Sequence, residues 1–181
     1  MKRTIINPLL PALILITLSP VLLATASGDL RAEAETAIKT LQRVDSTLTN
    51  LFSNSAGYAV FPRVGKGGLI FGAEHGNGIV YAQGKPIGEA TLTELNVGPQ
   101  VGTETFYEII FFETAEALAS FKEGHLEMSA KVSAVAAAEG TALIAKYREG
   151  VLVFTLPRSG LMAQASIGGQ KFRFKPLNSL P

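Results

Sequence analysis

Histidine and glutamate side chains are the first candidates for chemistry, because together they supply metal ligands and acid–base groups. The chain has two histidines, His75 and His125. Glu74 adjoins the first, while Glu123 and Glu127 flank the second. Neither histidine stands in an H-x-x-x-H or H-E-x-x-H spacing, which a zinc site on a helix would need. A hydrolase or metal enzyme that uses a histidine is therefore the weakest of three functional hypotheses, and no metal is expected.

Two glycine-rich stretches have residue types that could cradle a phosphate. Gly65-Lys66-Gly67-Gly68 places a lysine among glycines, but no Ser or Thr follows the lysine and a strand is predicted next, so a P-loop is disfavoured. Gly76-Asn77-Gly78 lacks the third glycine and the helix of a dinucleotide site. Ser159 and Ser166 stand near glycines, without a G-x-S-x-G elbow or a neighbouring base. We therefore expect bent hairpins, no catalytic residue and no cofactor.

Basic residues are the better candidates for a binding site. The residues proposed to meet lipid head groups are Arg63, Lys66, Lys171, Arg173 and Lys175. The last three alternate with Phe172 and Phe174, so a strand would place cations on one face and aromatic rings on the other. Each cation near an anionic membrane contributes about 1 kcal/mol of attraction. The alternative is a solvated outer face, since a few charges bind weakly at physiological salt.

Composition and charge narrow the class of protein. The 181 residues are 47% hydrophobic and 17% charged, which predicts one packed domain and little disorder. The 16 basic and 15 acidic residues nearly cancel, which argues against a general nucleic-acid binder. Acids dominate residues 89–139 and cations dominate 140–181. The absence of cysteine excludes disulfides, thiolate metal sites and the lipid-bearing cysteine of a bacterial lipoprotein.

The first 26 residues have the layout of a secretory signal peptide. A short basic start precedes an uncharged run over residues 4–28, which ends in the small residues Ala24-Thr25-Ala26. Prolines interrupt the run and disfavour a permanent membrane span. We expect cleavage after Ala26, a single domain over 27–181, and a periplasmic or secreted location. An uncleaved N-terminal anchor is the alternative.

Hydrophobic periodicity predicts an α+β domain with a strongly bent antiparallel β-sheet, barrel- or sandwich-like. An amphipathic helix is expected over 29–52, packed on the domain rather than on a membrane, because its polar face mixes acids and bases. A central helical segment is expected over 114–121 and 127–139. Strands are expected over 58–61, 67–74, 78–82, 87–97, 105–112, 142–147, 151–156, 160–165 and 172–174, with a hairpin turn at Asn77-Gly78.

An ordered series of motifs over about residues 30–177 resembles the SYLF domain family. The series includes Gly57-Tyr58-Ala59-Val60-Phe61-Pro62, Lys66-Gly67-Gly68, Gly78-Ile79-Val80-Tyr81, Ile109-Ile110-Phe111-Phe112 and Ser166-Ile167-Gly168-Gly169-Gln170-Lys171-Phe172. The resemblance implies lipid binding, which in eukaryotic members targets phosphoinositide membranes with help from a basic N-terminal segment. The helix expected here is charge-mixed and the chain is expected to be exported, so anionic phospholipid is the ligand that we expect.

These observations lead to one functional expectation and one alternative. The expectation is a lipid-binding module of the cell envelope, in which the five cations form a basic rim beside apolar surface and make a peripheral membrane contact. The alternative is a structural or protein-interaction domain of the periplasm or envelope without a lipid ligand.

Overall fold

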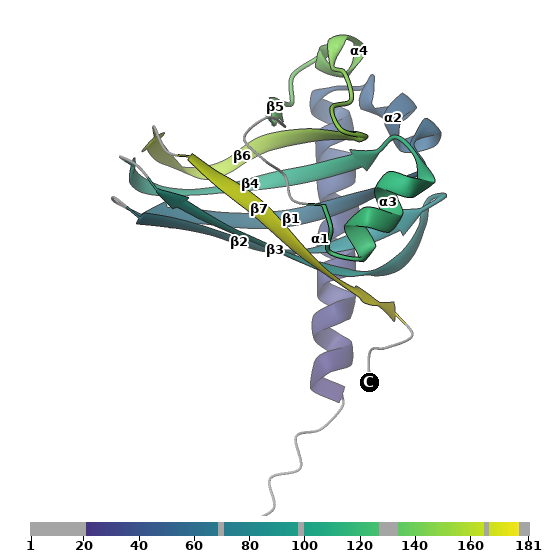
Figure 1. Ribbon diagram of the computed structural model, residues 1–181, viewed down its shortest axis with the longest axis horizontal. Coiled ribbons are helices and arrows are strands. Elements are labelled where there is room, and N and C mark those ends of the chain that lie inside the picture. Colours follow the sequence, from purple (N-terminus) through teal and green to yellow (C-terminus); the bar gives the residue numbers. More distant parts are fainter. Residues whose placement is uncertain (1–20, 69–70, 98–99, 127–133, 165–166, 178–181) are drawn as a thin grey trace, which may run out of the picture.

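The computed structural model describes residues 21–68, 71–97, 100–126, 134–164 and 167–177 (Figure 1). The elements in chain order are α1 (Val21–Val44), α2 (Leu48–Asn54), β1 (Gly57–Gly68), β2 (Phe71–Ala82), β3 (Lys85–Val97), β4 (Gln100–Phe112), α3 (Ala115–Lys122), β5 (Val135–Ala136), α4 (Thr141–Ile144), β6 (Val151–Gln164) and β7 (Ile167–Pro176). One sheet has the strand order β5-β6-β4-β1-β2-β3-β7 and is antiparallel except where β5 meets β6. The predicted α+β fold with a bent sheet is confirmed.

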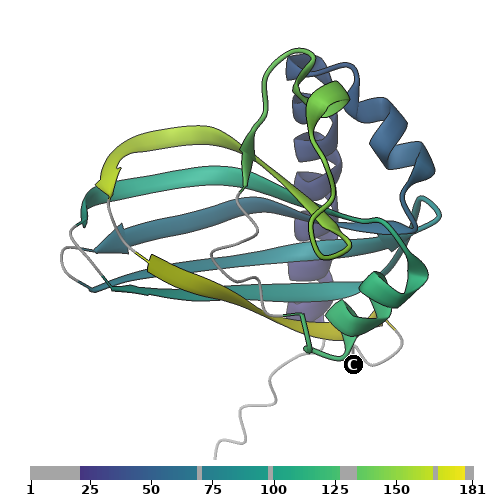
Figure 2. The same cartoon turned by 45° about the horizontal axis from the view of Figure 1, so that its top comes forward.

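Helices cover both faces of this sheet. α1 crosses one face, called here the outer face, while α3 lies against the opposite, inner face (Figures 1 and 2). Side chains alternate accordingly along β1: Tyr58 and Val60 pack with the buried residues of α1, whereas Ala59 and Phe61 join the cluster that includes α3. The domain therefore has two hydrophobic cores that share the sheet between them.

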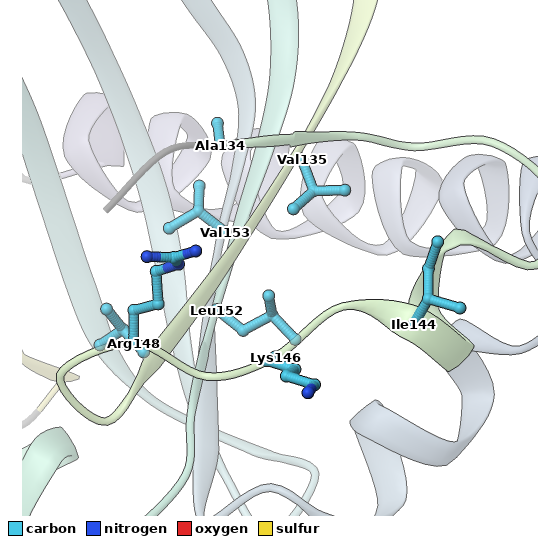
Figure 3. Close-up of a pocket in the computed structure, with 8 residues that line it drawn as sticks. Ala134, Val135, Ile144, Lys146, Arg148, Leu152 and Val153 are labelled. Atoms are coloured by element: carbon cyan, nitrogen blue, oxygen red, sulfur yellow. The ribbon is translucent and has the colours of Figure 1, made fainter. Parts of the chain in front are cut away.

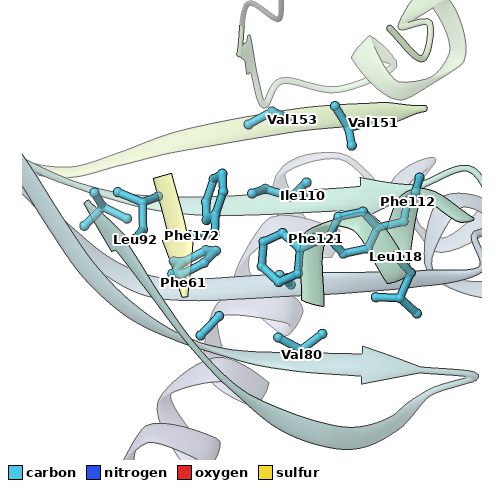
Figure 4. Close-up of a cluster of buried hydrophobic side chains, with 14 of the residues drawn as sticks. Phe61, Val80, Leu92, Ile110, Phe112, Leu118, Phe121, Val151, Val153 and Phe172 are labelled. Carbon is cyan, nitrogen blue, oxygen red and sulfur yellow. The ribbon is translucent and has the colours of Figure 1, made fainter. Parts of the chain in front are cut away.

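The inner core shows how strongly the sheet bends. β7 pairs with β3 at one end of the sheet, yet its Phe172 reaches the rings of Phe61 on β1 and Phe121 on α3. The ring centroids lie 6.0 and 5.1 Å apart, respectively. Figure 4 shows these rings converging with aliphatic side chains inside the curved sheet. β7 thus folds across the inner face and completes the core.

β1 and β2 are longer than predicted, because Pro62 and Gly78 lie inside these strands instead of ending them. The sequence predicts that β1 stops at Pro62, but both ladders of β1 shift register around this residue, which places it in a β-bulge where no ladder N–H is needed. The hairpin predicted at Asn77-Gly78 is wrong, since β2 runs straight through it. A Cβ on Gly78 would lie 2.5 Å from the Val60 carbonyl oxygen, so glycine is needed there for close packing.

The helix predicted over 29–52 is also interrupted. α1 ends at Val44 and α2 begins at Leu48, because the buried Asp45 carboxylate binds backbone elsewhere. Its Oδ1 accepts hydrogen bonds from Thr47 N at 3.0 Å, Thr47 Oγ1 at 2.5 Å and Gly140 N at 3.1 Å. Its Oδ2 accepts one from Ala142 N at 2.9 Å. Asp45 therefore joins the corner between α1 and α2 to the start of α4.

The C-terminal half holds the remaining differences. The predicted helix over 127–139 falls partly outside the described residues, and its described end contains the short strand β5. The strand predicted over 142–147 is replaced by α4 and an irregular segment. The two strands predicted over 151–165 form one strand, β6. α3 and its predicted cap are confirmed, since Thr114 Oγ1 accepts a hydrogen bond from Ala117 N at 3.3 Å.

The N-terminal predictions concern residues that the structure describes only from Val21. α1 begins there and continues past Ala26, so the expected cleavage site lies within the helix, and cleavage stays a prediction. Among the described helices, none combines the length and the apolar character that crossing a membrane requires.

Candidate functional site

The cations of β7 are arranged as the alternation predicts. Lys171, Arg173 and Lys175 are exposed, while Phe172 is buried and Phe174 half-buried on the opposite side of the strand. The neighbouring strand β3 places mostly uncharged residues beside them, since Thr93, Thr91 and Glu89 are their respective partners in register. Three of the five predicted head-group residues therefore form one line on the outer face.

The other two predicted cations lie apart from this line. Lys66 points to the inner face, where its ammonium forms an ion pair with the Glu74 carboxylate and only 15% of its side chain is exposed. Arg63 lies beside α1, where its Nη2 is 2.9 Å from Glu33 Oε1. The expectation of a single five-cation rim is therefore wrong, because the bulge and the sheet bend send these cations in different directions.

Lys66 belongs instead to a row of polar residues across the inner face, called here the polar row. Successive cross-strand neighbours run from β7 to β4: Gln170, Glu94, Glu74, Lys66 and Glu104. Opposite charges on directly paired strand residues attract, and like charges repel. Lys66 is the one cation of this row, and its register partners on the two neighbouring strands, Glu74 and Glu104, are both acids.

Glu108 lies on the same inner face and is 1% exposed. Gln170 reaches it from β7 across the bent sheet, with Nε2 donating to Glu108 Oε2 at 3.1 Å. Burial raises the pKa of Glu108 to about 8. The hydrogen bond from Gln170 opposes this rise in pKa only in part, and the negative charges of Glu74 and Glu94 add to the rise. Within the described residues, Glu108 Oε1 and Gln170 Oε1 have no hydrogen-bond partner. A carboxyl that keeps its proton at neutral pH fits this environment.

An open groove of about 280 Å³, called here the β6 groove, lies beside the first residues of β6. Its lining combines apolar side chains with two cations: Ala134, Val135, Ile144, Lys146, Arg148, Val151, Leu152 and Val153. Figure 3 shows Lys146 and Arg148 on the segment that leads into β6, with Val135 on the facing segment. Leu143 and Ile144, in the adjacent α4, are 70% and 79% exposed. Cations and accessible apolar surface therefore meet at this groove.

A second groove, of about 230 Å³, separates α1 from the bulged part of the sheet and is called here the α1 groove. Arg63 and Arg158 line it together with Glu33 and Tyr107. The guanidinium of Arg158 lies 4.7 Å from the centroid of the Tyr107 ring, and its Nη1 donates to the Pro62 carbonyl oxygen at 2.6 Å. Stacking and the hydrogen bond together hold this guanidinium in a defined orientation.

The residues considered for catalysis are dispersed. His75 is exposed on the outer face of β2, and His125 follows α3 with its Nδ1 3.2 Å from Glu123 Oε2. Ser159 is exposed on β6, and Ser166 lies outside the described residues. The part of the chain that the structure describes contains no group of three or more His, Cys, Asp or Glu residues able to hold a metal ion.

Sequence patterns singled out neither the β6 groove nor Glu108. The basic block over 140–181, which contains Lys146 and Arg148, was the sequence signal for the cations of the groove. The apolar Val135 and Ile144 beside them belong to β5 and α4, where the sequence predicted a helix and a strand, respectively. Glu108 interrupts the apolar run of β4, and a lone acid in a strand buried on both faces signals a buried carboxyl.

Comparison with known proteins gives one distant relation. No protein-family model matches the chain. The chain is similar to Beta cell expansion factor A of Aeromonas veronii, with 28% identity over 142 residues. The match covers 77% of this chain and 53% of that protein, so the chain spans about half the length of the curated relative that it matches.

Proposed function

We propose that this protein is a lipid-binding module of the SYLF type, which holds anionic phospholipid at the β6 groove and makes a peripheral membrane contact in the cell envelope. The observation that carries the proposal is the pairing of Lys146 and Arg148 with apolar lining in one open groove. The ordered SYLF-like motifs and the distant similarity to Beta cell expansion factor A are consistent with it. A periplasmic or secreted location follows if the N-terminal segment acts as a signal peptide.

The chemistry of the groove suits an amphiphile. The cations at its edge attract a phosphate head group, and the side chains of Val135 and Ile144 offer accessible surface to methylene groups. Each buried methylene contributes about 0.8 kcal/mol, so even a short length of acyl chain stabilises binding. Because about 280 Å³ is small for a ligand pocket, most of the phospholipid stays in the bilayer.

The cations of β7 add longer-range attraction. Lys171, Arg173 and Lys175 are exposed in a line, which favours approach to an anionic surface without requiring a pocket. Lys66 has no part in the proposal, because its ammonium is paired with Glu74 on the inner face.

Vesicle flotation tests the proposal. Binding is expected to rise with the fraction of phosphatidylglycerol and to fall between about 0.1 M and about 1 M salt, since surface attraction is screened. The double variant Lys146→Gln/Arg148→Gln is expected to bind about thirtyfold more weakly, which corresponds to about 1 kcal/mol for each lost cation. Equal binding of this variant and the wild type would contradict the proposal.

Two controls keep the test specific. Lys39→Gln/Lys85→Gln removes the same charge from exposed positions away from the groove and is expected to bind like the wild type. Ile144→Ser at the groove is expected to weaken binding, whereas Leu95→Ser, at a residue 77% exposed on β3, is not.

A protein-interaction domain of the envelope is the second candidate, and the exposed Leu143 and Ile144 favour it, because neighbouring exposed apolar residues also suit a protein partner. This candidate predicts a stable partner recovered from envelope extracts by the wild type and lost with Ile144→Ser, together with no binding to vesicles of any composition.

A further inference from the structure

We propose that the α1 groove is a binding site for a phosphate-type oxyanion, held between the guanidinium groups of Arg63 and Arg158. This site is separate from the β6 groove and does not depend on the proposed lipid binding, because the two grooves share no lining residue.

The two arginines come from different strands to line one groove. Arg63 belongs to the β1 bulge and Arg158 to the register shift of β6 against β4. In both places the extra residue lets a side chain leave the regular alternation of its strand. The remaining lining includes the small side chains of Ala32 and Thr36 on α1, which leave room beside the guanidinium groups.

Arg158 is oriented before any ligand arrives. Its guanidinium face lies over the Tyr107 ring, and one of its nitrogens donates to the Pro62 carbonyl oxygen at 2.6 Å. A guanidinium carries five N–H donors in one plane, so stacking on the ring leaves in-plane donors for an acceptor at the side. Planar donors of this kind match the oxygens of a phosphate group.

Arg63 is held by a partner that an oxyanion can replace. Its Nη2 is 2.9 Å from Glu33 Oε1, and the two side chains are 59% and 42% exposed. Such an exposed ion pair is weak because water screens it. Among the described residues that line the groove, Glu33 is the only acid, and its carboxylate already lies where a ligand oxyanion would bind Arg63. Two cations without Glu33 would match the charge of a phosphate dianion.

The experiment is a titration of the full chain with inorganic phosphate, followed by backbone amide NMR at constant ionic strength with chloride as the reference anion. Saturable shifts are expected at residues of the α1 groove. Arg63→Gln and Arg158→Gln are each expected to weaken phosphate binding about tenfold or more, because each removes charge-assisted donors. Glu33→Gln is expected to strengthen binding several-fold, because it removes the competing carboxylate.

The controls separate a site from general charge effects. Lys85→Gln removes one exposed cation from the start of β3 and is expected to leave phosphate affinity unchanged. Arg158→Lys keeps the charge but loses the planar donors, so affinity between those of the wild type and Arg158→Gln is expected. Amide spectra of each variant without phosphate verify that the fold is retained.

A parallel arm identifies the source of the oxyanion. Vesicles with phosphatidic acid present a phosphate monoester head group; binding to them that is lost in Arg63→Gln would assign the site to a lipid. Saturable binding of inorganic phosphate, together with vesicle binding that does not depend on Arg63, would assign the site to a small soluble phosphate. The proposal is overturned if phosphate causes no saturable shift in the groove, or if Glu33→Gln weakens binding. Lys146→Gln/Arg148→Gln is expected to keep phosphate binding, so failure here is distinguishable from failure of the lipid-binding proposal.

Discussion

Replacing Glu108 by glutamine is expected to stabilise the protein at neutral pH and to flatten the pH dependence of its stability. Burial inside the bent sheet raises the pKa of Glu108 from 4.5 to about 8, against the opposing hydrogen bond from Gln170. The charges of Glu74 and Glu94 raise this pKa further, while Lys66 lowers it. The unfolded chain carries the same carboxyl in its ionised form at pH 7. Folding at neutral pH therefore takes up a proton.

The two pKa values of Glu108, 4.5 and about 8, define the pH window. Between them the folded state holds more protons than the unfolded state, so the free energy of unfolding falls as pH rises through the window. One pKa unit corresponds to about 1.4 kcal/mol, so keeping Glu108 neutral at pH 7 costs roughly 3 kcal/mol. Glutamine carries no titrating proton, and Glu108→Gln is therefore expected to be more stable by up to about 3 kcal/mol at pH 7.

Glutamine also suits the contacts at this position. Its carbonyl oxygen can accept the hydrogen bond from Gln170 Nε2, and its amide group can donate to Gln170 Oε1, for which the described residues offer no other donor. The substitution thus imitates the protonated carboxyl without leaving a cavity.

Urea unfolding at pH 5, 6, 7 and 8 measures the effect. The wild type is expected to lose stability across this series and Glu108→Gln to change little. Glu113→Gln, which removes an exposed acid just after β4, serves as the matched control and is expected to change stability by less than about 0.5 kcal/mol. A variant that is less stable than the wild type at pH 7, or a wild type with no slope between pH 5 and 8, would show that Glu108 is ionised in the folded protein.

Two further substitutions test the fold. Asp45→Ala is expected to lower the free energy of unfolding by about 3 kcal/mol, because it leaves partly buried backbone donors without their carboxylate acceptor. Urea unfolding measures this, with exposed Asp29→Ala as a nearly neutral control. Burial raises the pKa of Asp45, but four hydrogen bonds from three residues outweigh burial and lower this pKa below 3.8. The stability that the Asp45 carboxylate contributes should therefore be lost as pH falls below 3.8 through the lowered pKa. A stability difference between the wild type and Asp45→Ala that stays the same at low pH would contradict this. Gly78→Ala is expected to lower the melting temperature by several degrees, or about 2 kcal/mol, because its Cβ would meet the Val60 carbonyl oxygen; Gly65→Ala, which meets nothing closer than 4.0 Å, should not. Equal melting temperatures of these two glycine variants would count against the packing described.

The local sequence pattern predicted the fold class correctly, but it often misplaced the ends of helices and strands. The alternation of Lys171 to Lys175 and the cap at Thr114 depend on neighbouring residues, and both were predicted correctly. Pro62 and Gly78 were interpreted as local turn signals, but the bulge of β1 and the packing of β2 depend on strands distant in sequence. Asp45 ends α1 for the same kind of reason, since two of its hydrogen-bond partners, Gly140 and Ala142, lie almost a hundred residues away.

The candidate sites were predictable only in part. The distribution of charge along the sequence identified the basic C-terminal block. Residue type alone does not show that Lys66 points to the inner face and pairs with Glu74, whereas Lys146 lines a groove. The direction of a side chain in a bent sheet depends on bulges and on which strands curl across which face. The contact between Glu108 and Gln170 required the fold itself, because Gln170 reaches Glu108 from a strand at the far end of the sheet.

Photo-crosslinking tests the central proposal most directly. The purified protein would be bound to vesicles that contain phosphatidylglycerol with a photoreactive acyl chain, irradiated and digested, and the labelled residues would be mapped by mass spectrometry. Label is expected to concentrate on the residues that line the β6 groove, all of which fall within 134–153, and Lys146→Gln/Arg148→Gln is expected to reduce it greatly. Label concentrated on β7 or spread evenly over the protein, and unchanged in that variant, would contradict lipid binding at the β6 groove.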